Sequence, residues 1–204
     1  MGLGGILFRQ LEDRGWLDDT HIIFTPDHGG WDGEYGLLFI GPSISDDIAR
    51  LPMIWKPAKN DNMPAAVVTS PVGALDLAAT FMEIAGVDIP DWVDGRPLPK
   101  SEEEAQQQGR DHVFCQYEGY TPDCGIVMNG VYADGKTLVQ YMPSPTYEGT
   151  EGELYDMEKD PTQRENFWDD PSYEGVKEDM IELIRTELLR VPQRHPLPEP
   201  GASI

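Results

Sequence analysis

The chain has 204 residues, enough for one domain of average size or for one body with a small appendage. Its 37 acidic residues outnumber 15 Lys and Arg, and the resulting net charge of −22 would repel nucleic acid and anionic membranes over most of the surface. A hydrophobic content of 39%, with five Trp and eight Tyr, excludes a disordered acidic tail. The sequence has no apolar run of about 18 residues and no secretion signal at its start. We therefore expect neither a nucleic-acid nor a membrane partner, and the cytoplasm is favoured.

The first hundred residues alternate between helix and strand patterns. Apolar residues at helical spacing predict a helix from Leu3 that ends at Gly15. A short apolar strand is predicted at 20–25 and a second strand at 50–55, both of the type found in parallel sheets. Ser70 and Pro71 are typical of a helix start, and Gly86 is typical of a helix end. This alternation predicts the α/β class.

Beyond residue 87 the pattern changes to a surface connection that leads into a small antiparallel sheet. Strands are predicted near 112–117, 125–128, 136–141 and 153–156, with turns at Asn129-Gly130 and Asp134-Gly135. A helix with one apolar stripe is predicted at 173–190 and should pack on the sheet. Pro192 and the later prolines forbid further helix.

Two parallel-type strands cannot form a complete sheet, because each needs neighbours on both edges and helices on both faces. We therefore expect the chain to be the C-terminal portion of a larger α/β protein.

Asp27 and His28 directly follow the predicted strand 20–25, at the end of the sheet where α/β proteins place their ligand sites. A carboxylate oxygen beside an imidazole nitrogen suits a divalent cation, and nearby glycines let the backbone approach a ligand closely. Two ligands do not saturate a metal, however. By spacing alone, an Asp turn with a hydrogen-bonded histidine remains the alternative.

Several motifs follow one another in a fixed order. They are Leu11-Glu12-Asp13-Arg14-Gly15, Thr25-Pro26-Asp27-His28-Gly29, Gly33-Glu34-Tyr35-Gly36-Leu37 and Glu153-Leu154-Tyr155-Asp156 with Asp160-Pro161. Their order and spacing resemble the type I sulfatases of the alkaline phosphatase superfamily. The family carries Leu-Glu-x-x-Gly, Ser/Thr-x-Asp-His/Asn-Gly, Gly-Glu-His/Tyr-Gly-Leu and a C-terminal Glu-Leu-Tyr-Asp-Leu-x-x-Asp-Pro signature.

The resemblance implies a partial alkaline-phosphatase-like parallel sheet with helices over residues 1–100, with a metal-ligand loop at 25–36. A C-terminal α+β subdomain would follow over 101–191, holding a small antiparallel sheet and its packed helix, and a Pro-rich tail over 192–204. The implied function is part of a sulfuric ester hydrolase. Asp27 and His28 would be metal ligands for a divalent cation, calcium in the first place, with manganese and magnesium as alternatives.

The same resemblance shows what this chain does not contain. The family nucleophile is a formylglycine made from Cys or Ser in Cys/Ser-x-Pro-x-Arg, and neither Cys115 nor Cys124 lies in such a motif. The catalytic residues are therefore unknown, and the chain alone is expected to be inactive. It would need the missing N-terminal half of the fold as a partner, and an anionic sulfate ester would be the substrate of the full-length parent.

A further departure follows Gly36, where many sulfatases place a lysine that contacts the sulfate. This chain reads Leu37-Leu38-Phe39-Ile40 there. The departure leaves two alternatives open: a portion of a related phosphoester or phosphonate hydrolase, and a non-catalytic stand-alone remnant.

Overall fold

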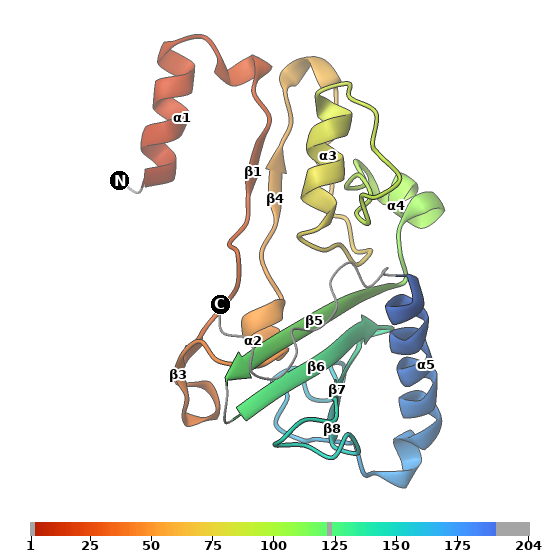
Figure 1. Cartoon of the computed structure of the whole chain (residues 1–204). Coiled ribbons are helices and arrows are strands. Elements are labelled where there is room, and N and C mark those ends of the chain that lie inside the picture. Colours follow the sequence, from red (N-terminus) through yellow and green to blue (C-terminus); the bar gives the residue numbers. More distant parts are fainter. Residues whose placement is uncertain (1–2, 122–123, 191–204) are drawn as a thin grey trace.

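The computed structural model describes residues 3–121 and 124–190 (Figure 1). One half of the molecule holds α1, β1, β4 and α3, and the other half holds the sheet β5 to β8 with α5 beside it (Figure 1). None of the helices within the described ranges combines the length and the apolarity that a bilayer crossing requires. The Pro-rich tail expected at 192–204 lies outside the described residues.

The N-terminal helix and strand form where the sequence pattern predicts them. Helix α1 spans Leu3–Asp13 and ends at Gly15, whose φ of 69° is the left-handed value that favours glycine. The Trp16 backbone N–H donates to the Leu11 carbonyl at 2.8 Å and closes this helix end. Strand β1 then spans Ile22–Phe24.

The second strand of this half corrects one expectation. β4 spans Ile54–Lys56, beginning after Pro52, and it pairs with β1 in antiparallel register with Phe24 opposite Ile54. The parallel orientation predicted for these two strands is therefore wrong. A parallel neighbour needs a crossover that returns the chain to its starting end. Here the chain enters β4 at the end where it leaves β1. The connection holds a small hairpin and one helical turn, namely β2 Trp31–Asp32, β3 Leu38–Phe39 and α2 Asp46–Ala49.

Helix α3 spans Asp76–Ile84 and begins later than Ser70 and Pro71 predict. The buried Asp76 carboxylate accepts the Gly73 backbone N–H at 2.8 Å and thereby organises the first turn. At the other end Gly86 has φ 65°, as predicted for a helix stop.

Residues 102–108 form a helix that the sequence reading missed. α4 spans Glu102–Gln108, where a plain surface connection is predicted. The Ser101 hydroxyl accepts the Glu104 N–H at 3.1 Å, and the Glu104 carboxylate accepts the Lys100 N–H at 2.8 Å. The Ser-Glu-Glu-Glu sequence was thus a capping signal.

The four-stranded antiparallel sheet has the order β5-β6-β7-β8, as predicted, with strands His112–Thr121, Cys124–Ala133, Lys136–Tyr141 and Gly152–Asp156. Asp134 and Gly135, with φ of 47° and 68°, form the predicted turn between β6 and β7. The Asn129-Gly130 turn is not formed, because both residues lie inside β6 opposite Gln116 and Cys115. A Cβ on Gly130 would lie 2.8 Å from the Ile44 side chain, so this glycine serves close packing.

The two faces of this sheet pack on different partners, as a period of two requires. Leu138 and Leu154 point to one face and pack with Met180 and Ile184 of α5, which spans Glu174–Arg190. Met128 and Val139 point to the other face and pack with Ile44, which precedes α2. The packed C-terminal helix is therefore confirmed, and the division of domains at residue 100 stays a prediction. Short 3-10 helices complete the chain at Leu17–Asp19, Glu34–Gly36, Lys59–Asp61 and Pro171–Tyr173.

Candidate functional site

Asp27 and His28 lie in the loop that leaves the carboxyl end of β1. Their side chains are 88% and 49% exposed, and the His28 Nε2 atom lies 3.8 Å from the Asp27 Oδ2 atom. The sequence placed both residues at this end of the strand, and the structure brings their donor atoms together on the surface.

Hydrogen bonds to the local backbone affect the pKa of the Asp27 carboxyl and the position of the hydrogen on the His28 ring. The Asp27 Oδ1 atom accepts the His28 backbone N–H at 3.0 Å, and this bond lowers the pKa of the carboxyl below its ordinary value. The His28 Nδ1 atom lies 2.7 Å from the Gly29 carbonyl oxygen, which can only accept, so Nδ1 carries the hydrogen. In the neutral ring the Nε2 lone pair is then directed outward beside the carboxylate, as a metal ligand requires.

Gly29 holds this pair against α2. Its N–H donates to the Ile48 carbonyl at 2.9 Å, and a Cβ at this position would lie 1.9 Å from the Asp47 carbonyl oxygen. Only a residue without a side chain permits that approach. The glycine after Asp-His is therefore explained by close backbone packing.

The glycine-rich loop that follows is attached to the C-terminal half of the chain. The Tyr35 hydroxyl donates to the Thr162 carbonyl at 3.2 Å, and the Arg164 guanidinium lies 5.1 Å from the Tyr35 ring centre. The buried Gln163 accepts the Asp46 backbone N–H at 2.8 Å. Sequence reasoning missed these contacts, because no local pattern joins residues more than a hundred positions apart.

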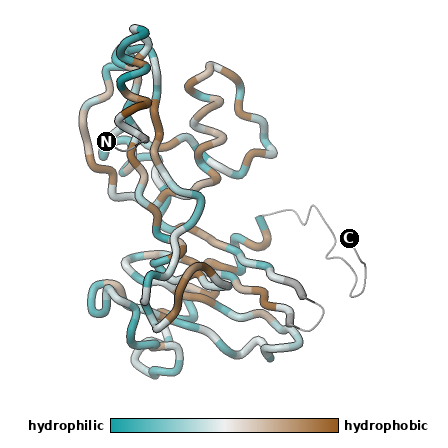
Figure 2. The backbone as a smooth tube through the Cα atoms, turned by 90° about the vertical axis from the view of Figure 1, so that its left-hand side faces the viewer, coloured by the Kyte–Doolittle hydropathy of each residue, from teal (hydrophilic) through white to brown (hydrophobic). Residues whose placement is uncertain are grey.

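The run from Leu37 to Ile40, which includes β3, is exposed, and the limb of the hairpin that holds it is the brown stretch that faces the viewer in Figure 2. A Cβ on Gly30 would lie 3.2 Å from the Phe39 carbonyl oxygen, so this apolar run adjoins the loop of Asp27 and His28. Phe39 has a φ of 72°, a strained value for a residue with a side chain.

Within the described residues no group of three or more His, Cys, Asp or Glu side chains is placed to hold a metal ion. The candidate cation site in the described residues therefore consists of two side chains, Asp27 and His28. A carboxylate and a neutral imidazole together carry a single negative charge, a small part of what a calcium site supplies.

Comparisons with known proteins agree with the motifs. Residues 33–189 match the family described as N-sulphoglucosamine sulphohydrolase, C-terminal. The chain is 26% identical over 185 residues to an N-acetylglucosamine-6-O-sulfatase of Bacteroides thetaiotaomicron, covering 88% of this chain and 32% of the relative. It is 28% identical over 174 residues to the uncharacterized sulfatase YidJ of Escherichia coli, covering 82% and 32%. The chain therefore spans about a third of the length of the curated relatives that it matches.

Solved structures share the fold. One is a protein in complex with its substrate D-glucosamine-2-N,6-O-disulfate, with a TM-score of 0.76, 26% identity and coverage of 94% of this chain and 38% of that one. A phosphonate monoester hydrolase of Agrobacterium radiobacter has a TM-score of 0.77 at 22% identity, covering 92% and 38%. The family match over most of the chain shows that it belongs to the N-sulphoglucosamine sulphohydrolase C-terminal family, as the C-terminal portion of a sulfatase of the alkaline phosphatase superfamily.

Proposed function

We propose that this chain supplies Asp27 and His28 as two ligands of the divalent-cation site of a sulfuric ester hydrolase. The observation that carries the proposal is the 3.8 Å separation of His28 Nε2 and Asp27 Oδ2. Two bonds of roughly 2.3–2.6 Å from one cation reach donors that far apart. With Nδ1 as the donor, Nε2 of the neutral imidazole carries the lone pair that a cation needs, and the backbone hydrogen bond that lowers the pKa of Asp27 favours its charged form.

Calcium is proposed first, with manganese and magnesium as alternatives. Calcium prefers oxygen donors, so Asp27 would supply the attraction and His28 a weaker contact. A bound cation of this kind neutralises charge on the oxygens of a sulfate ester. Asp27 would hold the cation by its charge, while Gly29 fixes the position of the loop against α2.

The substrate is proposed to be an anionic sulfate ester in the complete hydrolase. The relative with N-acetylglucosamine-6-O-sulfatase in its name and the structural neighbour solved with a disulfated glucosamine support this class. A phosphoester or phosphonate is the second candidate, favoured by the absence of a lysine in the run from Leu37 to Ile40.

The remaining ligands and the nucleophile are proposed to come from the N-terminal half of the fold. Large apolar side chains of α1, β1 and β4 are exposed in this chain, among them Ile6, Leu7, Phe24 and Ile54. Exposed apolar surface of this extent is typical of an interface. Covering it with the missing half would also complete the sheet to which β1 and β4 belong.

The metal proposal is tested on the chain by nuclear magnetic resonance with Mn²⁺ as a paramagnetic probe. We expect weak binding that broadens the amide signals of residues 27–30 first, because two ligands leave most of the coordination shell to water. Asp27→Asn should remove this local broadening, and Asp32→Asn, which changes an exposed carboxylate at the end of β2, should retain it. Broadening that is uniform over the acidic surface, or unchanged in Asp27→Asn, would contradict the proposal.

The reaction class is tested in the complete hydrolase with aryl sulfate and aryl phosphate. We expect the wild type to prefer the sulfate. Its kcat/KM for the sulfate should fall at least about a hundredfold in Asp27→Asn, because the charged ligand holds the cation in place. A preference for phosphate would favour the second candidate, and full activity of Asp27→Asn would exclude the ligand role.

A further inference from the structure

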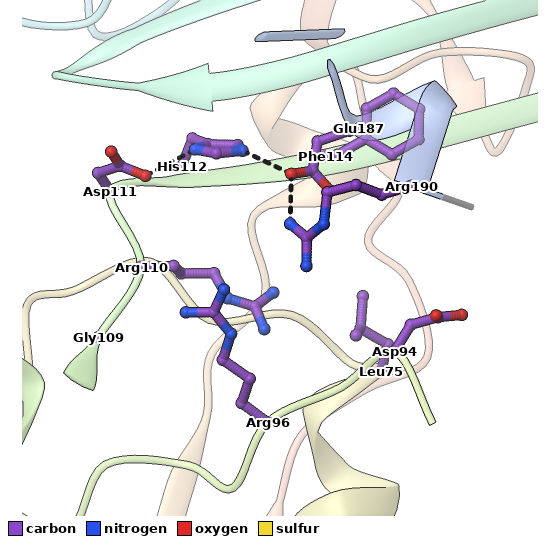
Figure 3. Close-up of a pocket in the computed structure, with 10 residues that line it drawn as sticks. All are labelled: Leu75, Asp94, Arg96, Gly109, Arg110, Asp111, His112, Phe114, Glu187 and Arg190. Atoms are coloured by element: carbon purple, nitrogen blue, oxygen red, sulfur yellow. Dashed lines mark hydrogen bonds and ion pairs between the residues drawn. The ribbon is translucent and has the colours of Figure 1, made fainter. Parts of the chain in front are cut away.

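A pocket of about 340 Å³ lies where the start of α3, the 94–96 loop, the start of β5 and the last turn of α5 meet (Figure 3). This volume is within the range of small-molecule sites, roughly 300–1,000 Å³. Asp27 and His28 do not line it, so it is separate from the proposed metal site. No motif of the sequence pointed to it.

Three of the nine arginines in a chain with a net charge of −22 line this pocket: Arg96, Arg110 and Arg190. Figure 3 shows their guanidinium groups directed toward one another from three different segments, with the Asp94 carboxylate turned away from them. Guanidinium groups this close repel one another, unless neighbouring carboxylates or a shared anionic ligand offset their charge.

Carboxylates around the pocket bind the guanidinium groups of Arg110 and Arg190, and Asp76 also accepts the Arg96 backbone N–H. The buried Asp76 carboxylate accepts from the Arg110 Nη2 atom at 2.6 Å and from the Arg96 backbone N–H at 2.9 Å. The Glu187 carboxylate accepts from the Arg190 Nη1 atom at 2.7 Å and lies 3.2 Å from the His112 Nε2 atom. A guanidinium has five N–H donors, so each of these arginines keeps donors for the open space.

We propose that this pocket binds a small ester of sulfate or phosphate, with the tetrahedral oxyanion placed among the guanidinium groups of Arg96, Arg110 and Arg190. Planar forks of N–H donors match the oxygens of such groups in bidentate fashion. The pocket is larger than a bare ion needs, and Leu75 and Phe114 supply an apolar wall for the body that carries the oxyanion. The ion pair of Arg110 with Asp76 fixes the deepest donor before the ligand arrives.

The test is calorimetric titration of the full chain at constant ionic strength with glucose 6-sulfate, glucose 6-phosphate, inorganic sulfate and neutral glucose. We expect one saturable site for the esters and none for glucose. The general acidity of the surface repels anions, so nonspecific binding would not imitate this signal. The two esters distinguish a sulfate ligand from a phosphate ligand.

Arg190→Gln and Arg96→Gln should each weaken binding of the ester at least about tenfold, through loss of charge-assisted hydrogen bonds. Arg185→Gln is the matched control, because Arg185 and Arg190 lie on the same helix, pair with a glutamate three residues earlier and are 67% and 57% exposed. The control and Asp27→Asn should bind as the wild type does. Absence of a saturable site for both esters, or equal weakening in Arg185→Gln and Arg190→Gln, would overturn the proposal.

Discussion

Asp76 and Arg110 form an ion pair with 2.6 Å between Oδ1 and Nη2, although they lie 34 residues apart in the sequence. Their side chains are 2% and 15% exposed, so the pair is largely shielded from water. Asp76 belongs to the first turn of α3, and Arg110 lies two residues before the start of β5. The pair therefore joins the helix of the first half to the first strand of the antiparallel sheet.

Replacing Asp76 with Asn should destabilise the chain by about 3–5 kcal/mol, because Arg110 would remain buried without its counter-charge. The free energy of unfolding is measured by urea denaturation, followed by the tryptophan fluorescence. Glu182→Gln breaks the exposed pair with Arg185 and should change stability by no more than about 0.5 kcal/mol. Equal effects of the two substitutions would show that the Asp76 pair contributes no more than a surface pair.

Replacing Gly29 with Ala should destabilise the loop that carries Asp27 and His28. The added methyl group would overlap the Asp47 carbonyl oxygen, and crowding of this kind costs about 1–3 kcal/mol when the backbone must shift. Gly175→Ala is the control, because a Cβ at that helical position meets no atom within 4 Å and should stabilise α5. Thermal unfolding should therefore shift in opposite directions for the two variants. A Gly29→Ala variant as stable as the wild type would contradict the close packing.

The elements with a clear period were predictable from the sequence. The apolar stripe of α5 and the Asp134-Gly135 turn each depend on residues that are close in the sequence, and the structure has both. Local patterns gave wrong predictions where contacts between residues distant in the sequence determine the structure. Asn129-Gly130 is typical of a hairpin turn, yet Ile44, more than eighty residues earlier, packs against Gly130 and keeps it inside β6.

The candidate site divides in the same way. The position of Asp27 and His28 follows from the strand before them, since the carboxyl end of a strand leads into the loop. Their support does not follow, because Gly29 contacts α2 and the Tyr35 hydroxyl bonds to Thr162, 127 residues later. The direction of β4 did not follow from the sequence either, because an apolar pattern on both faces indicates burial and does not fix the direction of the neighbouring strand.

Replacing Ile184 with Ala should cost about 2–5 kcal/mol, because this side chain is buried between α5 and the sheet and its loss leaves a cavity. Leu189→Ala on the same helix is the control, since Leu189 is exposed and its truncation should change stability by no more than about 0.5 kcal/mol. Urea denaturation of both variants measures the difference. If both lose the same stability, the helix does not pack on the sheet through this stripe.

Asp156 should make the stability of the chain sensitive to acid. Its buried carboxylate accepts from the Tyr173 hydroxyl at 2.8 Å and from the Glu158 and Lys159 backbone N–H groups at 3.2 and 3.3 Å. The Tyr173 hydrogen bond in the first place lowers the pKa of Asp156 below the ordinary value of 3.8.

The unfolded chain therefore binds a proton at this carboxyl at a higher pH than the folded chain does. Its stabilising contribution is complete above the ordinary pKa and is lost as the pH falls through the lower folded pKa. Urea midpoints measured from about pH 7 to about pH 2.5 should fall less steeply below about pH 4 in Asp156→Asn, which carries no titrating group there. Asp134→Asn, at an exposed turn position, should keep the wild-type slope. A slope in Asp156→Asn as steep as in the wild type would assign the acid sensitivity to other carboxylates, because only a group whose pKa differs between the folded and unfolded states contributes to it.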